Sequence, residues 1–265
     1  MQDHLVNVTV CELPDDSYDL SYAWSRLAEH IQEHDSQIVL LPEMPFSPWL
    51  ARTRRPDPAA WRASVEAHER WLERLVDLSP ALVLGSRPVI RLEKNTVRWL
   101  NEGFAWDATQ GLRAVHTKYY LPDDEGFWEA SWYQRGDGDF SALHVGPLCV
   151  GFMICTELWF QERARQYAKQ GVHMIACPRA TLAESVDKWL VGGRAAGIAA
   201  GAYCLSSNHT GPRGSFPHFG GHGWVSGPEG EVLGLTTQDK PFLTVKIDLR
   251  AAEQAKTTYP RYVAE

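Results

Sequence analysis

The sequence predicts an α/β protein in which helices cover β-sheets. Stretches with the pattern of a buried strand are followed by stretches with a helical apolar stripe, and this alternation occurs in each half of the chain. No internal repeat and no linker-like change of composition divides the 265 residues, so we expect one domain spanning residues 1–265. A hydrophobic content of 44% is ample for a well-buried core.

Charge and composition argue against several classes of protein. The chain has 26 Lys and Arg against 33 Asp and Glu, and this net charge of −7 lacks the basic excess of nucleic-acid-binding proteins. No apolar stretch is long enough to span a bilayer, and no signal peptide is visible, so we predict a cytoplasmic protein with no membrane partner. The five cysteines form neither a CxxC pair nor a Cys/His cluster, which predicts reduced thiols and no metal site.

The N-terminal segment predicts a strand, a helix and a second strand. The first strand covers Leu5–Val10, and the second, Ser36–Leu41, is a continuous apolar run ended by Pro42. Glu43 follows at once, where open α/β sheets bind their ligands, outside the carboxyl ends of the strands. The helix between the two strands is indicated by an apolar stripe at Leu20, Trp24, Leu27, Ala28 and Ile31.

The next segment predicts a helix, a strand and a hairpin. A helical stripe runs from Trp61 to Leu75, and Ala81–Ser86 reads as an apolar strand. Asn101–Trp106 and Leu112–Thr117 resemble the two arms of a hairpin, and Lys118 closes the second arm. The segment that follows, Tyr119–Asp139, is long, aromatic and acidic without a clean period, and such loops are more often functional than filler.

A cysteine marks the predicted corner between a strand and a helix. Leu148–Ile154 is an apolar run, Cys155 follows it, and a helical stripe from Phe160 to Ala168 comes next, with Gly171 as a plausible stop. The unpaired amides at such a corner would favour thiolate over thiol and could hold an oxyanion. The alternative is that this cysteine is a small hydrophobic residue of the core.

The remaining sequence predicts further strands and one helix. The Gly/Pro/His-rich stretch Asn208–Gly220 reads as a loop, and the tail Tyr259–Glu265 is too short for an element of its own. The predicted strands are Val172–Cys177, Tyr203–Ser207, Gly223–Ser226, Glu231–Leu235 and Phe242–Ile247, with a helix over Trp189–Ala200.

Three ionisable residues occupy equivalent places, each directly after a predicted strand. A thiolate at Cys155 requires a base and a cationic group for the oxyanion, and Glu43 and Lys118 could supply them. The alternative for the latter two is a structural ion pair or solvated loop ends.

At this point the sequence resembles the nitrilase superfamily of carbon–nitrogen hydrolases. The resemblance depends on LLPE at Leu40–Glu43, the stretch TKYYLPDDEGFWEASWYQRGD around Lys118 and VGFMICTELWFQERAR around Cys155, in that order, and it covers nearly the whole chain. It implies a four-layer α-β-β-α sandwich, no cofactor, and a homodimer or higher homo-oligomer. It also implies a cysteine-dependent hydrolase that acts through a thioester on a small-molecule amide or N-carbamoyl amide.

The resemblance also implies roles for individual residues. Glu43 matches the general base, Lys118 the lysine that stabilises the tetrahedral intermediate, and Cys155 the nucleophile. A second glutamate positions substrate and nucleophile in the family. We favour Glu129 for this role over Glu125, since Glu129 precedes an aromatic stretch and a Gly-Asp pair.

The substrate-binding residues are less well defined by sequence. The amide of Thr156 is the expected second oxyanion donor, and Trp128, Trp132 and Trp159 could line the pocket or pack elsewhere. Arg179 is a candidate for binding an anion, as is Arg194, and the alternative is a surface role or an ion pair.

Three other functions remain open at this stage. A nitrilase would use the same thiol on a C≡N group, although such enzymes are typically longer. A catalytically silent binding protein would be expected to lose at least one of the three reactive residues. A cysteine peptidase of Cys–His type would depend on a histidine such as His209 or His222.

Overall fold

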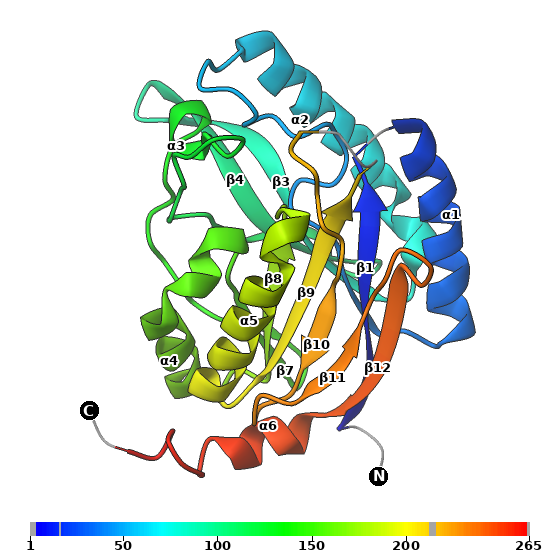
Figure 1. The fold of residues 1–265 in the computed structure, drawn as a ribbon, viewed down its shortest axis with the longest axis vertical. Coiled ribbons are helices and arrows are strands. Elements are labelled where there is room, and N and C mark those ends of the chain that lie inside the picture. The colour runs from blue at the N-terminus through cyan, green and yellow to red at the C-terminus, as the bar shows by residue number, and fades with distance from the viewer. Residues whose placement is uncertain (1–3, 16, 212–215, 264–265) are drawn as a thin grey trace.

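The computed structural model describes residues 4–15, 17–211 and 216–263, and it confirms the predicted α/β class (Figure 1). The strands are β1 (Leu5–Pro14), β2 (Ile38–Leu40), β3 (Leu82–Glu93), β4 (Thr96–Asp107), β5 (Gly111–Thr117), β6 (Leu143–Val145), β7 (Leu148–Phe152), β8 (Met174–Arg179), β9 (Tyr203–Thr210), β10 (Trp224–Ser226), β11 (Val232–Leu235) and β12 (Phe242–Asp248). The α-helices are α1 (Ser17–Glu33), α2 (Pro58–Leu72), α3 (Glu129–Trp132), α4 (Gln161–Lys169), α5 (Val186–Ala200) and α6 (Leu249–Ala255).

The strands form two halves that meet along β1 and β9, which lie side by side in Figure 1. One half has the order β12-β1-β2-β3-β4-β5, and the other has β6-β7-β8-β9-β10-β11. They are joined where Glu12–Pro14 of β1 pairs in parallel with Asn208–Thr210 of β9. The pairs β1–β2, β2–β3, β7–β8 and β8–β9 are parallel, and β5 runs in the direction of β3 because β4 is antiparallel to both.

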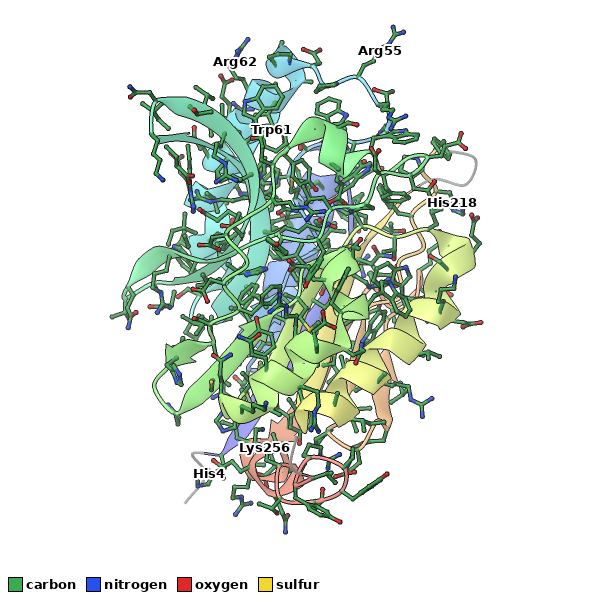
Figure 2. The ribbon with its side chains drawn as sticks, turned by 90° about the vertical axis from the view of Figure 1, so that its left-hand side faces the viewer. His4, Arg55, Trp61, Arg62, His218 and Lys256 are labelled. Atoms are coloured by element: carbon green, nitrogen blue, oxygen red, sulfur yellow. The ribbon has the colours of Figure 1, made fainter. Side chains whose placement is uncertain are left out.

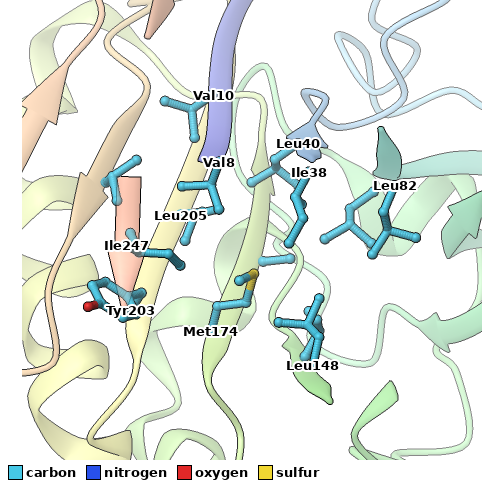
Figure 3. Packing of buried hydrophobic residues seen from close by; sticks show 14 of the residues in the cluster. Val8, Val10, Ile38, Leu40, Leu82, Leu148, Met174, Tyr203, Leu205 and Ile247 are labelled. Atoms are coloured by element: carbon cyan, nitrogen blue, oxygen red, sulfur yellow. The ribbon is translucent and has the colours of Figure 1, made fainter. Parts of the chain in front are cut away.

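The inner core lies between the two halves. Val8 and Val10 of β1 meet side chains such as Met174 of β8 and Leu205 of β9, as Figure 3 shows. The alternate residues of β1, such as Cys11, belong instead to a second core cluster beneath α1. Strands buried on both faces need apolar residues at every position, which explains why they read as continuous apolar runs.

Helices cover the outer face of each half. The predicted stripe of α1 is buried, with Trp24 and Leu27 fully enclosed in the second cluster. On the opposite side, Tyr167 of α4 and Ala196 of α5 pack in a third cluster against the other half. The order of layers is therefore helix, sheet, sheet, helix, as the resemblance implied (Figure 1).

Three features differ from the sequence prediction. The ribbon of β3 and β4 is longer than expected, because both strands continue to a turn at Lys94 and Asn95, which have φ angles of +48° and +64°. The short helix α3 lies inside the segment expected to be irregular, and α6 was not predicted. Lys256 directly follows α6, and it lies with His4 at the end of the molecule opposite Arg55 and Arg62 (Figure 2).

The arrangement places several strand ends at one edge of the protein. Since β2, β5, β7 and β8 run in the same direction, their carboxyl ends meet there. None of the described helices is both long and apolar enough to cross a membrane. Residues 212–215 of the predicted loop Asn208–Gly220 and the last two residues of the predicted tail lie outside the described residues.

Candidate active site

The structure brings together the three ionisable residues that follow predicted strands. Glu43 lies shortly after β2, Lys118 directly after β5 and Cys155 shortly after β7. The exposed fractions are 0% for Glu43 and Lys118 and 3% for Cys155. Enclosure of this kind removes water from the charged groups, so each of them requires partners supplied by the protein.

Lys118 bridges two buried carboxylates. Its Nζ donates to Glu43 Oε1 at 2.7 Å and to Glu129 Oε2 at 2.6 Å. Asn101 Nδ2 donates to the same oxygen of Glu43 at 2.8 Å. Burial acts to lower the pKa of the Lys118 ammonium, but the carboxylates of Glu129 and Glu43 outweigh it and raise that pKa above its ordinary value. The lysine is therefore held in its cationic form.

The two candidate second glutamates occupy different environments. Glu129 begins α3, is fully buried, and accepts a hydrogen bond from the Tyr133 hydroxyl as well as from Lys118. Burial raises the pKa of Glu129 to about 7, although Lys118 acts against this rise. Glu125 is exposed, and its backbone amide donates to Asp124 Oδ1. The geometry therefore associates Glu129, and not Glu125, with Lys118.

Each carboxylate retains one oxygen without a partner. Glu43 Oε2 and Glu129 Oε1 are buried and have no hydrogen-bond partner among the described residues, and the same holds for Asn101 Oδ1. Buried acceptors of this kind are costly unless something donates to them. A bound molecule with N–H or O–H groups could supply the donors that these oxygens lack.

Cys155 lies in a strained turn. Its φ angle of +49° is in the left-handed region, which is uncommon for a residue with a side chain. The predicted helix does not begin directly at this residue, because a 3₁₀ turn over Cys155–Trp159 comes before α4. The Cys155 Sγ atom lies 4.0 Å from the carbonyl oxygen of Ala180 at the end of β8.

The expectation that the protein favours the thiolate of Cys155 is wrong for this structure. Burial raises the pKa of the Cys155 thiol well above its ordinary value, and the charge of Glu43 raises it further, although Lys118 acts in the opposite direction. The resting cysteine is therefore a thiol, and a neighbouring base must take its proton when it reacts.

A cavity of about 190 Å³ opens onto this cluster. Cys155, Thr156 and Glu129 form its reactive side. The other lining residues are mainly apolar or hydroxyl-bearing: Pro122, Asp124, Phe127, Ala180, Thr181, Leu182, Ser185 and Trp189. Such a volume suits a small ligand whose reacting group reaches the cysteine.

The predicted tryptophans do not line this cavity. Trp128 lies beneath the guanidinium of Arg54, at 4.8 Å from the ring centroid. Trp132 is one wall of a separate cavity of about 680 Å³ between α2 and the loop before it. Trp159 is 39% exposed and packs against Trp189, which does line the cavity beside Cys155. Proximity in sequence to the reactive residues was a poor guide to their orientation.

Arg179 also lies outside the lining of the cavity. Its guanidinium is fully buried and donates to Ser206 Oγ, to Thr181 Oγ1 and to the carbonyl oxygen of His222. Its own carbonyl oxygen accepts the backbone amide of Glu43 at 3.2 Å. Arg179 therefore supports the chain around the cluster, whereas Arg194 is exposed and donates to the carbonyl oxygen of Gly230.

Sequence reasoning missed several residues that hold the cluster. Asn101 and Tyr133 donate to the two carboxylates, and Glu157 is a fully buried carboxylate two residues after Cys155. A polar residue inside an apolar strand pattern, as Asn101 is, can signal such a role. For Tyr133 and Glu157 the sequence carried no comparable signal.

The histidines named as alternatives do not pair with the cysteine. His209 Nε2 donates to the carbonyl oxygen of Glu43 at 2.6 Å, and burial lowers the pKa of this imidazole. His222 contributes its backbone amide to Glu12 and its carbonyl oxygen to Arg179. Within the described chain, neither imidazole is placed as the base of a Cys–His pair.

The whole-chain comparison identifies the family. A family model described as carbon–nitrogen hydrolase matches residues 7–257. The chain belongs to the carbon–nitrogen hydrolase family. It is therefore a hydrolase that acts on non-peptide C–N bonds. The solved structures that it resembles include an amidase from Nesterenkonia sp., with a TM-score of 0.74 at 19% identity, covering 94% of this chain and 92% of that one.

Individual relatives agree with this assignment. The carbon–nitrogen hydrolase is 24% identical to the chloroplastic omega-amidase of Arabidopsis thaliana over 96% of its own length and 70% of that protein. It is 27% identical to the N-carbamoylputrescine amidase of Oryza sativa over about half of each chain, 51% and 50%. A solved carbon–nitrogen hydrolase from Helicobacter pylori G27 has a TM-score of 0.85 at 21% identity, covering 99% of this chain and 96% of that one.

Proposed function

We propose that the protein hydrolyses a small amide or N-carbamoyl amide through a thioester on Cys155. The observation that carries the proposal is the Lys118 ammonium, which bridges two buried carboxylates beside a buried thiol. The family supplies the reaction class, amide C–N hydrolysis, and this cluster supplies a base, a cation and a nucleophile for it.

The first half of the reaction forms the thioester. Cys155 Sγ attacks the carbonyl carbon while Glu43 takes the thiol proton, and the carbonyl oxygen becomes an oxyanion. Lys118 has three N–H bonds, two of which are directed to carboxylates, and the third stabilises that oxyanion together with the amide of Thr156. Glu43 then gives its proton to the departing nitrogen as the C–N bond breaks.

The second half releases the acid. Water takes the place of the departed ammonia or amine, and Glu43 removes a proton from it as its oxygen attacks the thioester carbon. The C–S bond breaks, the thiolate regains a proton, and the carboxylic acid leaves. Glu129 positions both steps, since it accepts a second hydrogen bond from Lys118 beside that of Glu43 and keeps an oxygen free for a substrate N–H.

The cavity favours a compact substrate. About 190 Å³ accommodates a chain of a few carbon atoms beyond the reacting amide. Phe127, Leu182 and Trp189 suit an apolar chain, while Ser185 and Asp124 offer polar contacts to a substrate in the same cavity. A small primary amide or carbamoyl-amine meets these requirements.

The test is release of ammonia or amine from a panel of primary amides, carbamoyl-amines, ureido acids and nitriles. We expect turnover of an amide or carbamoyl compound, and its loss in Cys155→Ala and Glu43→Gln. Cys149→Ala is the matched control, because Cys149 is a buried cysteine outside the cavity and its variant should keep the wild-type rate. A covalent adduct of the substrate's acyl mass on Cys155 in wild-type protein quenched with acid during turnover would identify the thioester directly.

Other outcomes would reject the proposal in definite ways. Turnover of nitriles alone would identify a nitrilase, and full activity in Cys155→Ala would exclude the thiol mechanism. Binding without turnover across the panel would point to a binding protein that retains the fold. We also propose, from the resemblance alone, that the enzyme is a homodimer or higher homo-oligomer, which light scattering in solution would test.

A further inference from the structure

His116 and Glu157 form a buried pair that links the two halves of the reactive cluster. His116 lies on β5, two residues before Lys118, and Glu157 lies two residues after Cys155. The His116 Nε2 atom is 2.8 Å from Glu157 Oε2, and the side chains are 2% and 0% exposed. Neither residue lines the catalytic cavity, so the pair acts on the cluster only through the chain.

The Glu157 carboxylate holds the backbone on both sides of the cluster. Its Oε2 accepts the amide of Ile154, the residue before Cys155, at 2.8 Å. Its Oε1 accepts the amide of Tyr119, the residue after Lys118, at 2.7 Å. One carboxylate therefore fixes the turn that carries the nucleophile and the strand end that carries the cation, and it fixes them relative to each other.

The hydrogen bonds of His116 require protons on both ring nitrogens. Nδ1 lies 3.0 Å from the carbonyl oxygen of Asp139, which can only accept, so Nδ1 carries a proton. Nε2 faces a carboxylate oxygen that already accepts an amide, so Nε2 also donates. Burial acts to lower the pKa of His116, but Glu157 raises it above the ordinary value, in agreement with an imidazolium.

The surroundings of His116 allow its imidazole to exchange a proton with solvent. A polar cavity of about 170 Å³ borders the imidazole, and the charged groups around it are Arg91 of β3 and Asp137 and Asp139 of the segment after α3. The ring of Phe140 packs against the imidazole at 4.8 Å between centroids. Arg91 is itself paired with Glu102, so Glu157 is the direct partner of the imidazolium.

We propose that the charged His116–Glu157 pair is a positioning device that keeps the Lys118 strand end and the Cys155 turn in reactive register, so that turnover declines when His116 loses its proton. The proposal rests on the function proposed above. The pair is needed because Cys155 has a left-handed φ angle. A residue in such a strained conformation persists only where its surroundings enforce it. A neutral His116 has one N–H group, whereas the Asp139 carbonyl oxygen and the Glu157 carboxylate each require one. The hydrogen bond between His116 and Glu157 therefore weakens when the imidazole loses its charge.

The first experiment observes the charge of His116 in the wild-type protein. Nitrogen-15 NMR of labelled imidazoles distinguishes an imidazolium from either neutral tautomer as pH is raised. We expect both nitrogens of His116 to remain protonated above the ordinary pKa of 6.5. A neutral ring at or below that value would overturn the proposal, and this measurement requires no substrate.

The second experiment uses His116→Gln, whose amide can donate to Glu157 but carries no charge. We expect kcat to fall by about tenfold with KM changed less than about threefold, and the alkaline decline of kcat to flatten. The rate of alkylation of Cys155 by iodoacetamide should fall in parallel. Because alkylation needs no turnover, it still tests this device if the proposed hydrolysis itself fails.

The matched control is His173→Gln. His173 is another enclosed imidazole near a carboxylate, with Nε2 3.4 Å from Glu253 Oε1. Its Nδ1 accepts the backbone amide of Cys149 at 3.0 Å, at the end of β7 opposite Cys155. Its variant should keep the wild-type alkylation rate and pH profile. If His116→Gln lowers only the melting temperature and keeps the wild-type kcat, alkylation rate and alkaline decline, the pair is structural alone and the proposal is wrong.

Discussion

Lys118 and Arg179 are two cations fully enclosed by the protein, and they are stabilised by different means. Lys118 donates to two carboxylates, which raise the pKa of its ammonium. Arg179 donates to hydroxyls and a carbonyl oxygen, and its guanidinium lies 4.1 Å from the ring centroid of Trp224. Burial lowers the pKa of Arg179 to about 10, so this group remains charged at neutral pH without a carboxylate in contact.

The difference separates the cation to which we assign a role in the reaction, Lys118, from one that supports the fold, Arg179. A lysine that must stabilise an oxyanion has to stay charged in a dry site, and a compact ammonium needs anions nearby to do so. A guanidinium is charged in almost any setting, and its planar donors can fix several chain segments at once. Arg179 accordingly joins β8, β9 and the segment at His222, while its carbonyl oxygen accepts the amide of Glu43.

The largest effect is expected for Lys118→Met, which removes the proposed oxyanion-stabilising cation and leaves Glu43 and Glu129 buried together. We expect turnover to fall more than about 1,000-fold, since oxyanion stabilisation is lost. The free energy of unfolding should fall by roughly 3–5 kcal/mol at neutral pH, and partly recover on acidification as a carboxylate takes a proton. Steady-state rates and chemical denaturation measure both, with exposed Lys188→Met as the control. An active Lys118→Met protein would contradict the distinction.

Glu129→Gln tests whether Lys118 requires the negative charge of Glu129 or only a side chain of that shape. The amide keeps an oxygen for Lys118 and Tyr133 but removes a negative charge, and we expect turnover to fall about 100-fold. The matched control is exposed Glu125→Gln, which should stay within about twofold of wild type. Equal losses in the two variants would contradict the assignment of Glu129 to the cluster.

The same substitution should also change how stability depends on pH. In wild type the folded pKa of Glu129, about 7, is above its ordinary value of 4.5, so the folded state holds this proton more tightly than the unfolded state. Its contribution to stability is therefore fully present below pH 4.5 and is lost as pH rises through 7. Glu129→Gln should remove this slope, a change on the order of 1–3 kcal/mol in urea denaturation across that range.

The comparison also shows what the sequence could and could not predict. Glu43, Lys118 and Cys155 were recognisable because each follows a strand whose pattern is clear, and strand ends meet at one edge of an α/β fold. The α/β class was equally predictable, since strands such as β2, Ile38–Leu40, are fully buried and carry an apolar residue at every position. The four-layer sandwich came from the family resemblance alone.

The parts that escaped prediction depend on contacts between distant segments. Glu129 is held by Tyr133 only because a four-residue helix forms in a segment with no periodic pattern. The thiol state of Cys155 follows from burial beside Glu43, which local turn geometry does not reveal. An arginine such as Arg179 could bind an anion or support the chain, and its sequence neighbours are compatible with both.

Arg179→Met should give the reverse balance from Lys118→Met, with a large loss of stability and a small loss of activity. The variant loses donors to Ser206, Thr181 and His222 and leaves those acceptors buried, so we expect a cost of about 2–4 kcal/mol in the free energy of unfolding. Turnover by the folded fraction should fall less than about tenfold, because the guanidinium contacts no lining atom of the reactive side and acts through the position of the chain.

A graded version isolates the structural role. Ser206→Ala removes the acceptor of Arg179 Nε, 2.7 Å away, and the hydroxyl that donates to the carbonyl oxygen of Cys177 at 2.8 Å. We expect a loss of about 1–2 kcal/mol in the free energy of unfolding, with kcat and KM within about twofold of wild type. Arg194→Met is the control for the loss of an arginine, since that side chain is exposed and should change neither quantity measurably. If either Arg179→Met or Ser206→Ala abolished turnover at unchanged stability, Arg179 would be reactive machinery like Lys118. The kind of acceptor around a buried cation, neutral or anionic, would then not indicate whether that cation supports the fold or takes part in the reaction of this enzyme.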